Sequence, residues 1–331
     1  MNKLNYPTCI RSFKNFLKSD SKYLNIYNEI LKKPQVFDVS LRDGLQTVGK
    51  LDIDKYCLER KKEIYYNILE THHPKHMEIG SYVSPKVMPI FIDTPELFKC
   101  IELYDSQLGN GLKPDLYLFV PTLEKLVELE NKHNDIFLFC NNFSLTTSCS
   151  FGFQMKNINK TLNETKEDLN VIIKYLQNKK GTNNFKIKLY ISCINECPVN
   201  GKLDIDYIVD EIMYYYMNYK IDNICLSDTM GTLEPNDFEK IIDKCIFWGM
   251  NNSFLSLHLH YKEKNTDDER RIEEIITKAL TRKINKFDVS EMRMGGCPIT
   301  LDKEKIKNNL TYELFYKCLV DHIINLSKNT Y

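Results

Sequence analysis

Residues 36–44 read VFDVSLRDG and decide between two α/β folds. The run from Val36 to Leu41 has the valine and phenylalanine content of a strand. A doubly wound sheet that binds a dinucleotide would favour a glycine-rich turn directly after this strand. Gly44 is the only glycine there, and the whole chain has 12. The stretch therefore argues against a dinucleotide site and favours a closed barrel.

Outward from this stretch, β-rich runs alternate with longer segments of helical periodicity. Strands are predicted at Val36–Leu41, His76–Ser81, Asp115–Val120, Asp135–Cys140, Phe185–Cys193, Asp222–Leu226, Ser253–His260 and Lys286–Ser290. Helices are predicted between them, for example at Asp54–Leu69, Leu162–Leu176, Ile205–Tyr219, Asp237–Phe247 and Asp267–Thr281. Such alternation indicates a parallel sheet, and eight strands close a (β/α)8 barrel. We therefore expect a single-domain TIM barrel at residues 34–331, after an N-terminal extension at residues 1–33.

The composition excludes several classes of protein. The chain has 331 residues, of which 43% are hydrophobic, so a mainly disordered chain is excluded. Lys+Arg and Asp+Glu number 45 each, so no net positive charge attracts nucleic acid. The apolar runs are too short to span a bilayer, so we expect no membrane partner. Eleven cysteines without paired spacing are typical of a reducing compartment.

The start of the chain bears on localisation. Before Asp20 it carries Lys3, Arg11, Lys14 and Lys18 and no acidic residue. A mitochondrial transit peptide is also basic and poor in acids, but it is normally richer in Arg and Ser. We expect a solvated extension and a cytoplasmic protein, with mitochondrial import as the alternative.

Polar residues follow the predicted strands at the carboxyl ends, where barrel enzymes carry their chemistry. Arg42 and Asp43 end the first strand. Glu78 alternates with apolar neighbours in the second strand, so it should point into the barrel and pair with Arg42. Asp228 ends the sixth strand, where capping is the alternative role.

The predicted seventh strand ends in a pair of histidines. Since side chains alternate along a strand, His258 and His260 share one face, and Leu255, Leu257 and Leu259 share the other. Two imidazoles on one face form half of a metal site, or they cap the strand. After the eighth strand, two glycines precede Cys297, which either reaches the barrel mouth or lies buried in a turn. A cysteine thiol has an ordinary pKa of about 8.5, so at neutral pH it can donate a proton.

Six ordered motifs within about residues 35–320 resemble 3-hydroxy-3-methylglutaryl-CoA (HMG-CoA) lyase, of the DRE-TIM metallolyase or pyruvate carboxyltransferase superfamily. Residues 39–46 carry its RDGLQ signature, and residues 78–86 resemble its E-x-x-S-F-V-S-P-K stretch. The others are Ser192-Cys193 with Cys197-Pro198 and Gly201-Lys202, Leu226–Gly231, His258-Leu259-His260 and Gly295-Gly296-Cys297-Pro298.

The resemblance implies a TIM-barrel lyase with a divalent metal, Mg²⁺ or Mn²⁺, and an acyl-CoA substrate. The implied metal ligands are Asp43, His258, His260 and Asn309. The implied catalytic residues are Arg42, its partner Glu78, the acid Asp228, His258 and the loop cysteine Cys297. The family often forms dimers, so a homodimer is the implied assembly.

The implied reaction cleaves a branched 3-hydroxyacyl-CoA to acetyl-CoA and acetoacetate by retro-Claisen or aldol chemistry. A metal stabilises the hydroxyl oxygen as it loses its proton, and mixed nitrogen and oxygen ligands suit Mg²⁺ or Mn²⁺. Arg42 can hold the enolate oxygen, because its charge persists at any working pH. Cys297 can protonate the enolate carbon, and Asp228 or His258 can move the hydroxyl proton.

The chain departs from the family pattern around the barrel mouth. Residues 261–265 replace an aspartate and a glycine-containing turn, residues 299–305 replace a Gly- and Ala-rich loop, and an insertion is expected near residues 145–155. Lys303 and Lys305 either begin a solvated helix or contact CoA phosphates. Two alternative functions stay open. One is a Claisen-type synthase, which the resemblance disfavours because Leu45 stands after RDG where a synthase has glutamate. The other is a non-catalytic barrel that binds acyl-CoA or a protein.

Overall fold

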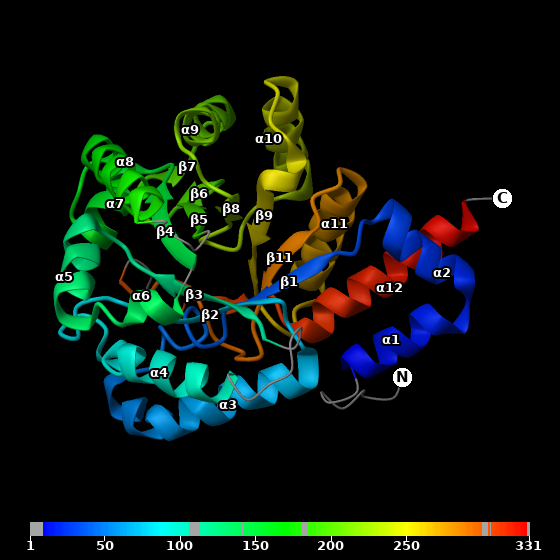
Figure 1. Ribbon diagram of the computed structural model, residues 1–331. Coiled ribbons are helices and arrows are strands. Elements are labelled where there is room, and N and C mark those ends of the chain that lie inside the picture. Colours follow the sequence, from blue (N-terminus) through cyan, green and yellow to red (C-terminus); the bar gives the residue numbers. More distant parts are fainter. Residues whose placement is uncertain are drawn as a thin grey trace.

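A closed barrel of parallel strands forms the centre of the computed structural model (Figure 1). The structure describes residues 9–105, 113–140, 142–179, 185–299, 304 and 306–329. Within them, eight strands close in the order β1-β11-β9-β8-β5-β4-β3-β2. Their bounds are β1 Gln35–Asp38, β2 His76–Ser81, β3 Asp115–Phe119, β4 Asn142–Ser148, β5 Lys186–Ser192, β8 Asn223–Ser227, β9 Leu255–His258 and β11 Lys286–Val289.

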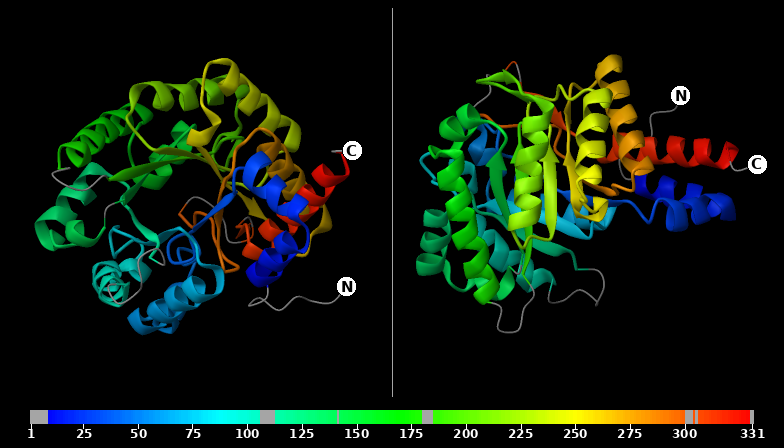
Figure 2. Two further views of the ribbon diagram at one scale, coloured as in Figure 1. Left: turned by 45° about the vertical axis from the view of Figure 1, so that its right-hand side comes forward. Right: turned by 90° about the horizontal axis from the view of Figure 1, so that it is seen from above.

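Helices surround the barrel as an outer ring, which the two further views show from other sides (Figure 2). They are α3 Leu58–His72, α4 Thr94–Asp105, α5 Leu123–His133, α6 Ile136–Phe139, α7 Phe151–Ile158, α8 Leu162–Asn178, α9 Ile205–Asn218, α10 Pro235–Phe247, α11 Thr266–Thr281 and α12 Tyr312–Lys328. Three shorter helices are η3 Lys50–Tyr56, η4 Pro89–Phe91 and η5 Asn252–Phe254. Two antiparallel strand pairs complete the fold of the described residues: β6 Glu196–Cys197 pairs with β7 Gly201–Lys202, and β10 His260–Tyr261 pairs with β12 Asn308–Asn309. The α/β TIM-barrel prediction is confirmed.

The predicted fourth strand is wrong, whereas the other seven predicted strands overlap observed ones. Residues 136–139 are the helix α6, and the true strand is β4, Asn142–Ser148. The apolar run 136–139 does not by itself distinguish a strand from a buried helix. The real strand, NFSLTTS, is rich in Ser and Thr, yet all its residues are buried between β3 and β5. Leu145, predicted to begin an insertion, therefore lies inside the barrel wall.

The helices before the barrel pack on its last helix. α1 Cys9–Ser19, α2 Ser21–Asn25 and η2 Ile26–Ile30 lie beside α12 in Figures 1 and 2. The rings of Phe13 and Tyr316 are 4.9 Å apart, and Leu17 is buried in the main core. Lys3 lies outside the described residues, and the boundary between residues 33 and 34 stays a prediction.

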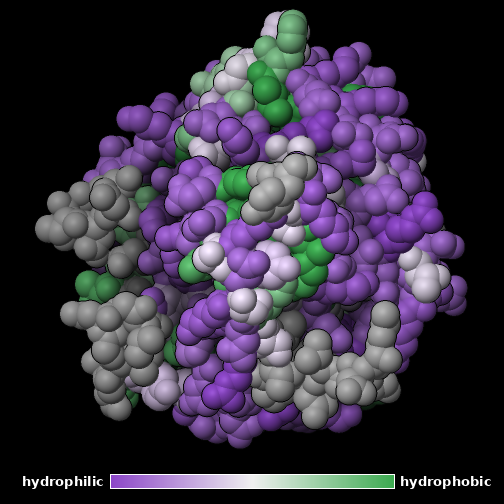
Figure 3. Space-filling view, turned by 90° about the vertical axis from the view of Figure 1, so that its right-hand side faces the viewer, coloured by the Kyte–Doolittle hydropathy of each residue, from purple (hydrophilic) through white to green (hydrophobic). Residues whose placement is uncertain are grey.

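Hydrophilic side chains cover most of the face that carries α12 (Figure 3). Within the described ranges, no helix combines the length and the apolar character needed to cross a membrane. The apolar side chains instead lie between the barrel and its helices, where Leu255 and Leu257 of β9 are fully buried. This arrangement leaves the inward faces of the strands for polar residues.

Candidate metal centre and active site

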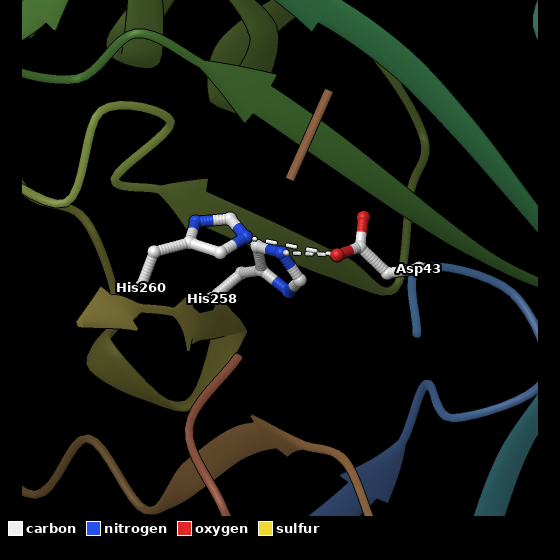
Figure 4. A group of neighbouring side chains, drawn as sticks. All are labelled: Asp43, His258 and His260. Atoms are coloured by element: carbon white, nitrogen blue, oxygen red, sulfur yellow. Dashed lines mark ion pairs between the residues drawn. The ribbon is translucent and has the colours of Figure 1, made fainter. Parts of the chain in front are cut away.

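Three side chains from two distant segments converge at the carboxyl end of the barrel. Asp43 follows β1, His258 ends β9 and His260 begins β10. Asp43 Oδ2 lies 3.7 Å from His258 Nε2 and 3.6 Å from His260 Nε2, and Figure 4 shows both rings directed at the carboxylate. All three residues are buried, and their ligand atoms lie within 4.8 Å of one another. The shared face predicted for the two histidines is thus observed.

The hydrogen bonds of the two imidazoles define their tautomers. His258 Nδ1 lies 3.2 Å from Asp288 Oδ2, and His260 Nδ1 lies 3.0 Å from the carbonyl oxygen of Asp228. Both partners are acceptors, so each Nδ1 carries the hydrogen. Each Nε2 therefore presents a lone pair toward Asp43. With both Nε2 atoms unprotonated, the two imidazoles and the Asp43 carboxylate offer three facing electron pairs, which fit a bound cation.

Electrostatics give Asp43 the protonation state of a metal ligand. Burial opposes its ionisation, but the nearby charge of Arg42 holds the pKa of its carboxyl well below its usual range. Burial lowers the pKa of His258. Burial also acts to lower the pKa of His260, but its interactions with Asp43 raise the pKa above the ordinary value. The negative charge of Asp43 attracts a proton to His260. A bound cation would take the place of that proton.

Asn309 completes the group of candidate ligands. β10 pairs with β12 so that His260 lies opposite Asn309. The amide Nδ2 of Asn309 donates to the carbonyl of Met294 at 3.0 Å, whereas its Oδ1 is buried without a hydrogen-bond partner among the described residues. A Cβ on Gly295 would lie 2.2 Å from Asn309 Nδ2 and 2.8 Å from Asp43 Oδ2. Glycine at 295 therefore permits the close approach of these two side chains, and the orphaned oxygen suits a fourth ligand.

Arg42 and Glu78 form the predicted buried pair. Arg42 Nε donates to Glu78 Oε2, and Nη1 donates to Asp43 Oδ1 at 2.6 Å. The guanidinium carbon lies 4.8 Å from the ring centre of Tyr190 and 5.1 Å from that of Phe119. Nη2 makes no hydrogen bond to the described residues, and Arg42 lines the cavity. The structure confirms that the side chains of Arg42 and Glu78 form an ion pair.

The structure adds supporting residues that sequence reasoning missed. Tyr190 donates to Glu78 Oε2 at 3.2 Å. Asp288, which accepts from His258, also accepts from the buried Lys188. Burial opposes ionisation of Asp288, but the charge of Lys188 lowers its pKa to about 2. Asp288 alternates with Phe287 and Val289, so the argument used for Glu78 would have found it.

Asp228 does not line the cavity, and neither do Glu78 and Asn309. The carboxylate of Asp228 accepts from the backbone N–H groups of Thr232 and Leu233 and from Arg271. Asp228 is 1% exposed, and among the described residues it is not part of the cavity wall. Its carboxylate anchors the loop behind His260, and its catalytic role stays a prediction.

Cys297 lies at the cavity, as predicted. The cavity has a volume of about 260 Å³, and its wall includes Arg42, Asp43, His258, His260 and Cys297. The thiol of Cys297 is half-buried and lies 3.4 Å from Asn157 Oδ1. Residues 300–303 and 305 lie outside the described residues, and with them the predicted roles of Lys303 and Lys305.

Comparison with curated proteins shows similarity to HMG-CoA lyases. The mitochondrial hydroxymethylglutaryl-CoA lyase of Macaca fascicularis is 25% identical over 268 residues, which are 81% of this chain and 73% of that protein. The 3-hydroxy-3-isohexenylglutaryl-CoA/hydroxy-methylglutaryl-CoA lyase of Pseudomonas aeruginosa is 24% identical over 81% of this chain and 79% of that protein. No family model matches. The resemblance drawn from the motifs is confirmed.

Solved structures agree on the fold. An HMG-CoA lyase from Acinetobacter baumannii, in complex with coenzyme A and 3-methylmalate, superposes with a TM-score of 0.67 at 22% identity, covering 90% of each chain. The HMG-CoA lyase of Bacillus subtilis gives a TM-score of 0.64 at 23% identity, covering 90% of this chain and 94% of the other. Both comparisons support the single TIM barrel.

Proposed function

We propose that this chain is a divalent-metal-dependent lyase that cleaves HMG-CoA, or a related branched 3-hydroxyacyl-CoA, into acetyl-CoA and acetoacetate. The observation that carries the proposal is the convergence of Asp43 Oδ2 and the Nε2 atoms of His258 and His260 beside Arg42. The similarity to curated HMG-CoA lyases over 81% of the chain names the reaction class.

Asp43, His258, His260 and Asn309 would hold the ion. Two ligand atoms that each lie about 2.1 Å from one ion are at most about 4.2 Å apart, and both separations from Asp43 to a histidine are shorter. A bound divalent ion would supply Lewis-acid stabilisation to a substrate oxygen as the tertiary hydroxyl loses its proton. The resemblance implies Mg²⁺ or Mn²⁺, which suit the carboxylate and amide oxygens of the set.

The protein's own residues perform the remaining steps. Arg42 holds the enolate oxygen of the departing acetyl-CoA through Nη2, while Glu78 and Asp43 fix the other side of its guanidinium. The thiol of Cys297 donates a proton to the enolate carbon. His258 and Asp228 are the two candidates for accepting the hydroxyl proton. His258 lines the cavity, but it can accept the proton only while its Nε2 does not bind the ion, because its Nδ1 hydrogen is directed at Asp288.

The cavity fits the acyl end of the substrate. Its volume of about 260 Å³ is below the roughly 300–1,000 Å³ of pockets that enclose a drug-sized ligand. We infer that the branched acyl group enters the cavity and that the nucleotide end of CoA lies outside. The homodimer and the cytoplasmic location remain predictions, and sedimentation and microscopy of the tagged protein would measure them.

One assay tests the proposal against its alternatives. Purified protein is incubated with HMG-CoA and Mg²⁺ or Mn²⁺, and acetoacetate is measured with and without a chelator. The expected result is metal-dependent acetoacetate that Arg42→Met abolishes. Condensation of acetyl-CoA without measurable cleavage would indicate the synthase, and tight binding of the thioester without any product would indicate the non-catalytic barrel.

A further inference from the structure

Arg271 of α11 is a buried arginine directly behind the candidate metal centre. It is 8% exposed, and the described residues satisfy three of its nitrogens. Nη2 donates to the carbonyl of His260 at 2.9 Å, and Nε donates to Asp268 at 2.9 Å. Nη1 donates to the carbonyl of Leu233 at 2.8 Å and to Asp228 Oδ2 at 3.2 Å. One rigid guanidinium therefore joins α11 to two loops of the barrel mouth.

Both of those loops determine how His260 is held. Arg271 fixes the backbone of His260 directly through the carbonyl oxygen. It also binds the carboxylate of Asp228, whose own carbonyl oxygen accepts the Nδ1 hydrogen of His260. The acceptor that selects the tautomer of His260 is thus anchored by the same side chain that anchors its main chain. An acceptor on Nδ1 is what leaves the Nε2 lone pair available to a metal.

The second histidine has a separate support. His258 Nδ1 contacts Asp288, which pairs with Lys188 inside the barrel. Within the part of the chain that the structure describes, the hydrogen bonds of Arg271 do not include this pair. The two imidazole rings therefore depend on different charged groups. Because Asp228 N also donates to the carbonyl oxygen of His258 at 3.0 Å, a change at Arg271 should act mainly, and not exclusively, on His260.

The segment after His260, residues 261–265, is one of those that depart from the family pattern. Here α11 holds it: Lys262 N donates to Asp268 Oδ2 at 2.7 Å, and Lys264 N donates to Glu269 at 2.9 Å. Lys307 donates to Asp268 at 2.9 Å and to the carbonyl of Gly231 at 2.7 Å. In this chain, charged residues of α11 therefore connect the loops around His260.

We propose that Arg271 is a positioning residue for metal binding, which holds His260 in the orientation and tautomer that present Nε2 to the ion. The inference rests on the proposed metal site and goes beyond it, because it assigns a role to a residue outside the cavity. Residues that support a metal ligand from behind change metal affinity by about 10–100-fold when they are removed.

The test is a titration of the full-length apoprotein with Mn²⁺, in which electron paramagnetic resonance measures the free ion. Arg271→Gln should bind Mn²⁺ about 10–100-fold more weakly than the wild type. Arg271→Lys, which keeps the charge without the forked geometry, should lie between them. The matched control is Arg282→Gln at the opposite, C-terminal end of α11, which loses ion pairs to Glu239 and Asp243 and should bind as the wild type does.

Two further measurements separate the possible failures. The visible spectrum of bound Co²⁺ should change in Arg271→Lys if the position of His260 changes, even where Arg271→Gln does not fold. Equal Mn²⁺ affinity and equal Co²⁺ spectra in wild type and folded Arg271 variants would overturn the role of Arg271 and leave the lyase proposal standing. No Mn²⁺ binding by the wild type would overturn both.

Discussion

The two sides of the barrel mouth support their functional residues in different ways. On the β1–β2 side, Arg42, Asp43 and Glu78 bind one another, so the signature motifs supply both the groups and their partners. On the β8–β9 side, His258 and His260 rely on Asp288 and on Arg271 with Asp228, which come from other strands and from a helix. In the first arrangement two motif residues pair with each other across 36 positions of the chain, whereas in the second Asp288 and Arg271 lie outside the motifs.

This difference has an electrostatic consequence. The β1–β2 side concentrates charge that is neutralised at short range, so removing one member leaves an unpaired buried charge. On the β8–β9 side, Asp288 and Asp228 support the imidazoles, and each has its own buried cation, Lys188 or Arg271. Removing a supporting group there acts on the ligands indirectly. We therefore expect variants on the first side to have the larger effects.

The largest expected effect is that of Arg42→Met. Loss of one group that stabilises an oxyanion lowers kcat by about 10²–10³-fold. The variant should also lose about 3–5 kcal/mol of unfolding free energy, because Glu78 stays buried without its cation. Steady-state kinetics and urea unfolding measure the two effects. Activity within tenfold of the wild type would contradict the role of Arg42.

On the opposite side, His258→Ala removes a proposed ligand itself. We expect metal affinity to fall by more than the roughly 10–100-fold assigned to supporting residues. Elemental analysis after dialysis against limiting Mn²⁺ measures the occupancy, with Arg282→Gln as the control. Unchanged occupancy would remove His258 from the site.

Cys297 sharpens the comparison, because it lies on a loop that belongs to neither side. Cys297→Ala should lower kcat by about 10²-fold, which is the lower end of the range for loss of a general acid. The effect should be small within that range because water can enter and donate the proton in place of the thiol. Metal affinity should not change. If the variant binds metal normally and keeps full kcat, another group protonates the enolate. Wild-type activity should also rise with reductant, because an accessible thiol oxidises readily.

The smallest effect on activity is expected for Asp38→Asn, below the site. Burial raises the pKa of Asp38 to about 6, although hydrogen bonds from Ser40 and Tyr312 act to lower it. The folded protein then binds this proton more tightly than the unfolded chain, so stability falls as the pH rises from about 4 to about 6, by about 3 kcal/mol. The difference in unfolding free energy between wild type and variant should follow that curve. A difference independent of pH would refute the shift.

Sequence alone predicts the barrel and its rim because strand alternation places residues such as Glu78 and His258 on known faces. It misplaces the fourth strand because Ser and Thr of β4 fill the barrel interior and resemble a loop, while the apolar run 136–139 forms a helix. It cannot identify Arg271, which stands in a run of charged residues typical of an exposed helix face. Its function arises only when α11 packs behind His260.

The most direct test of the central claim is a crystal structure of the protein soaked with Mn²⁺, with anomalous diffraction used to locate the ion. We predict one peak in contact with Asp43, His258 and His260, at about 2.0–2.2 Å from each ligand atom. A peak elsewhere, or an anomalous map without a peak between these three side chains at saturating Mn²⁺, would contradict it.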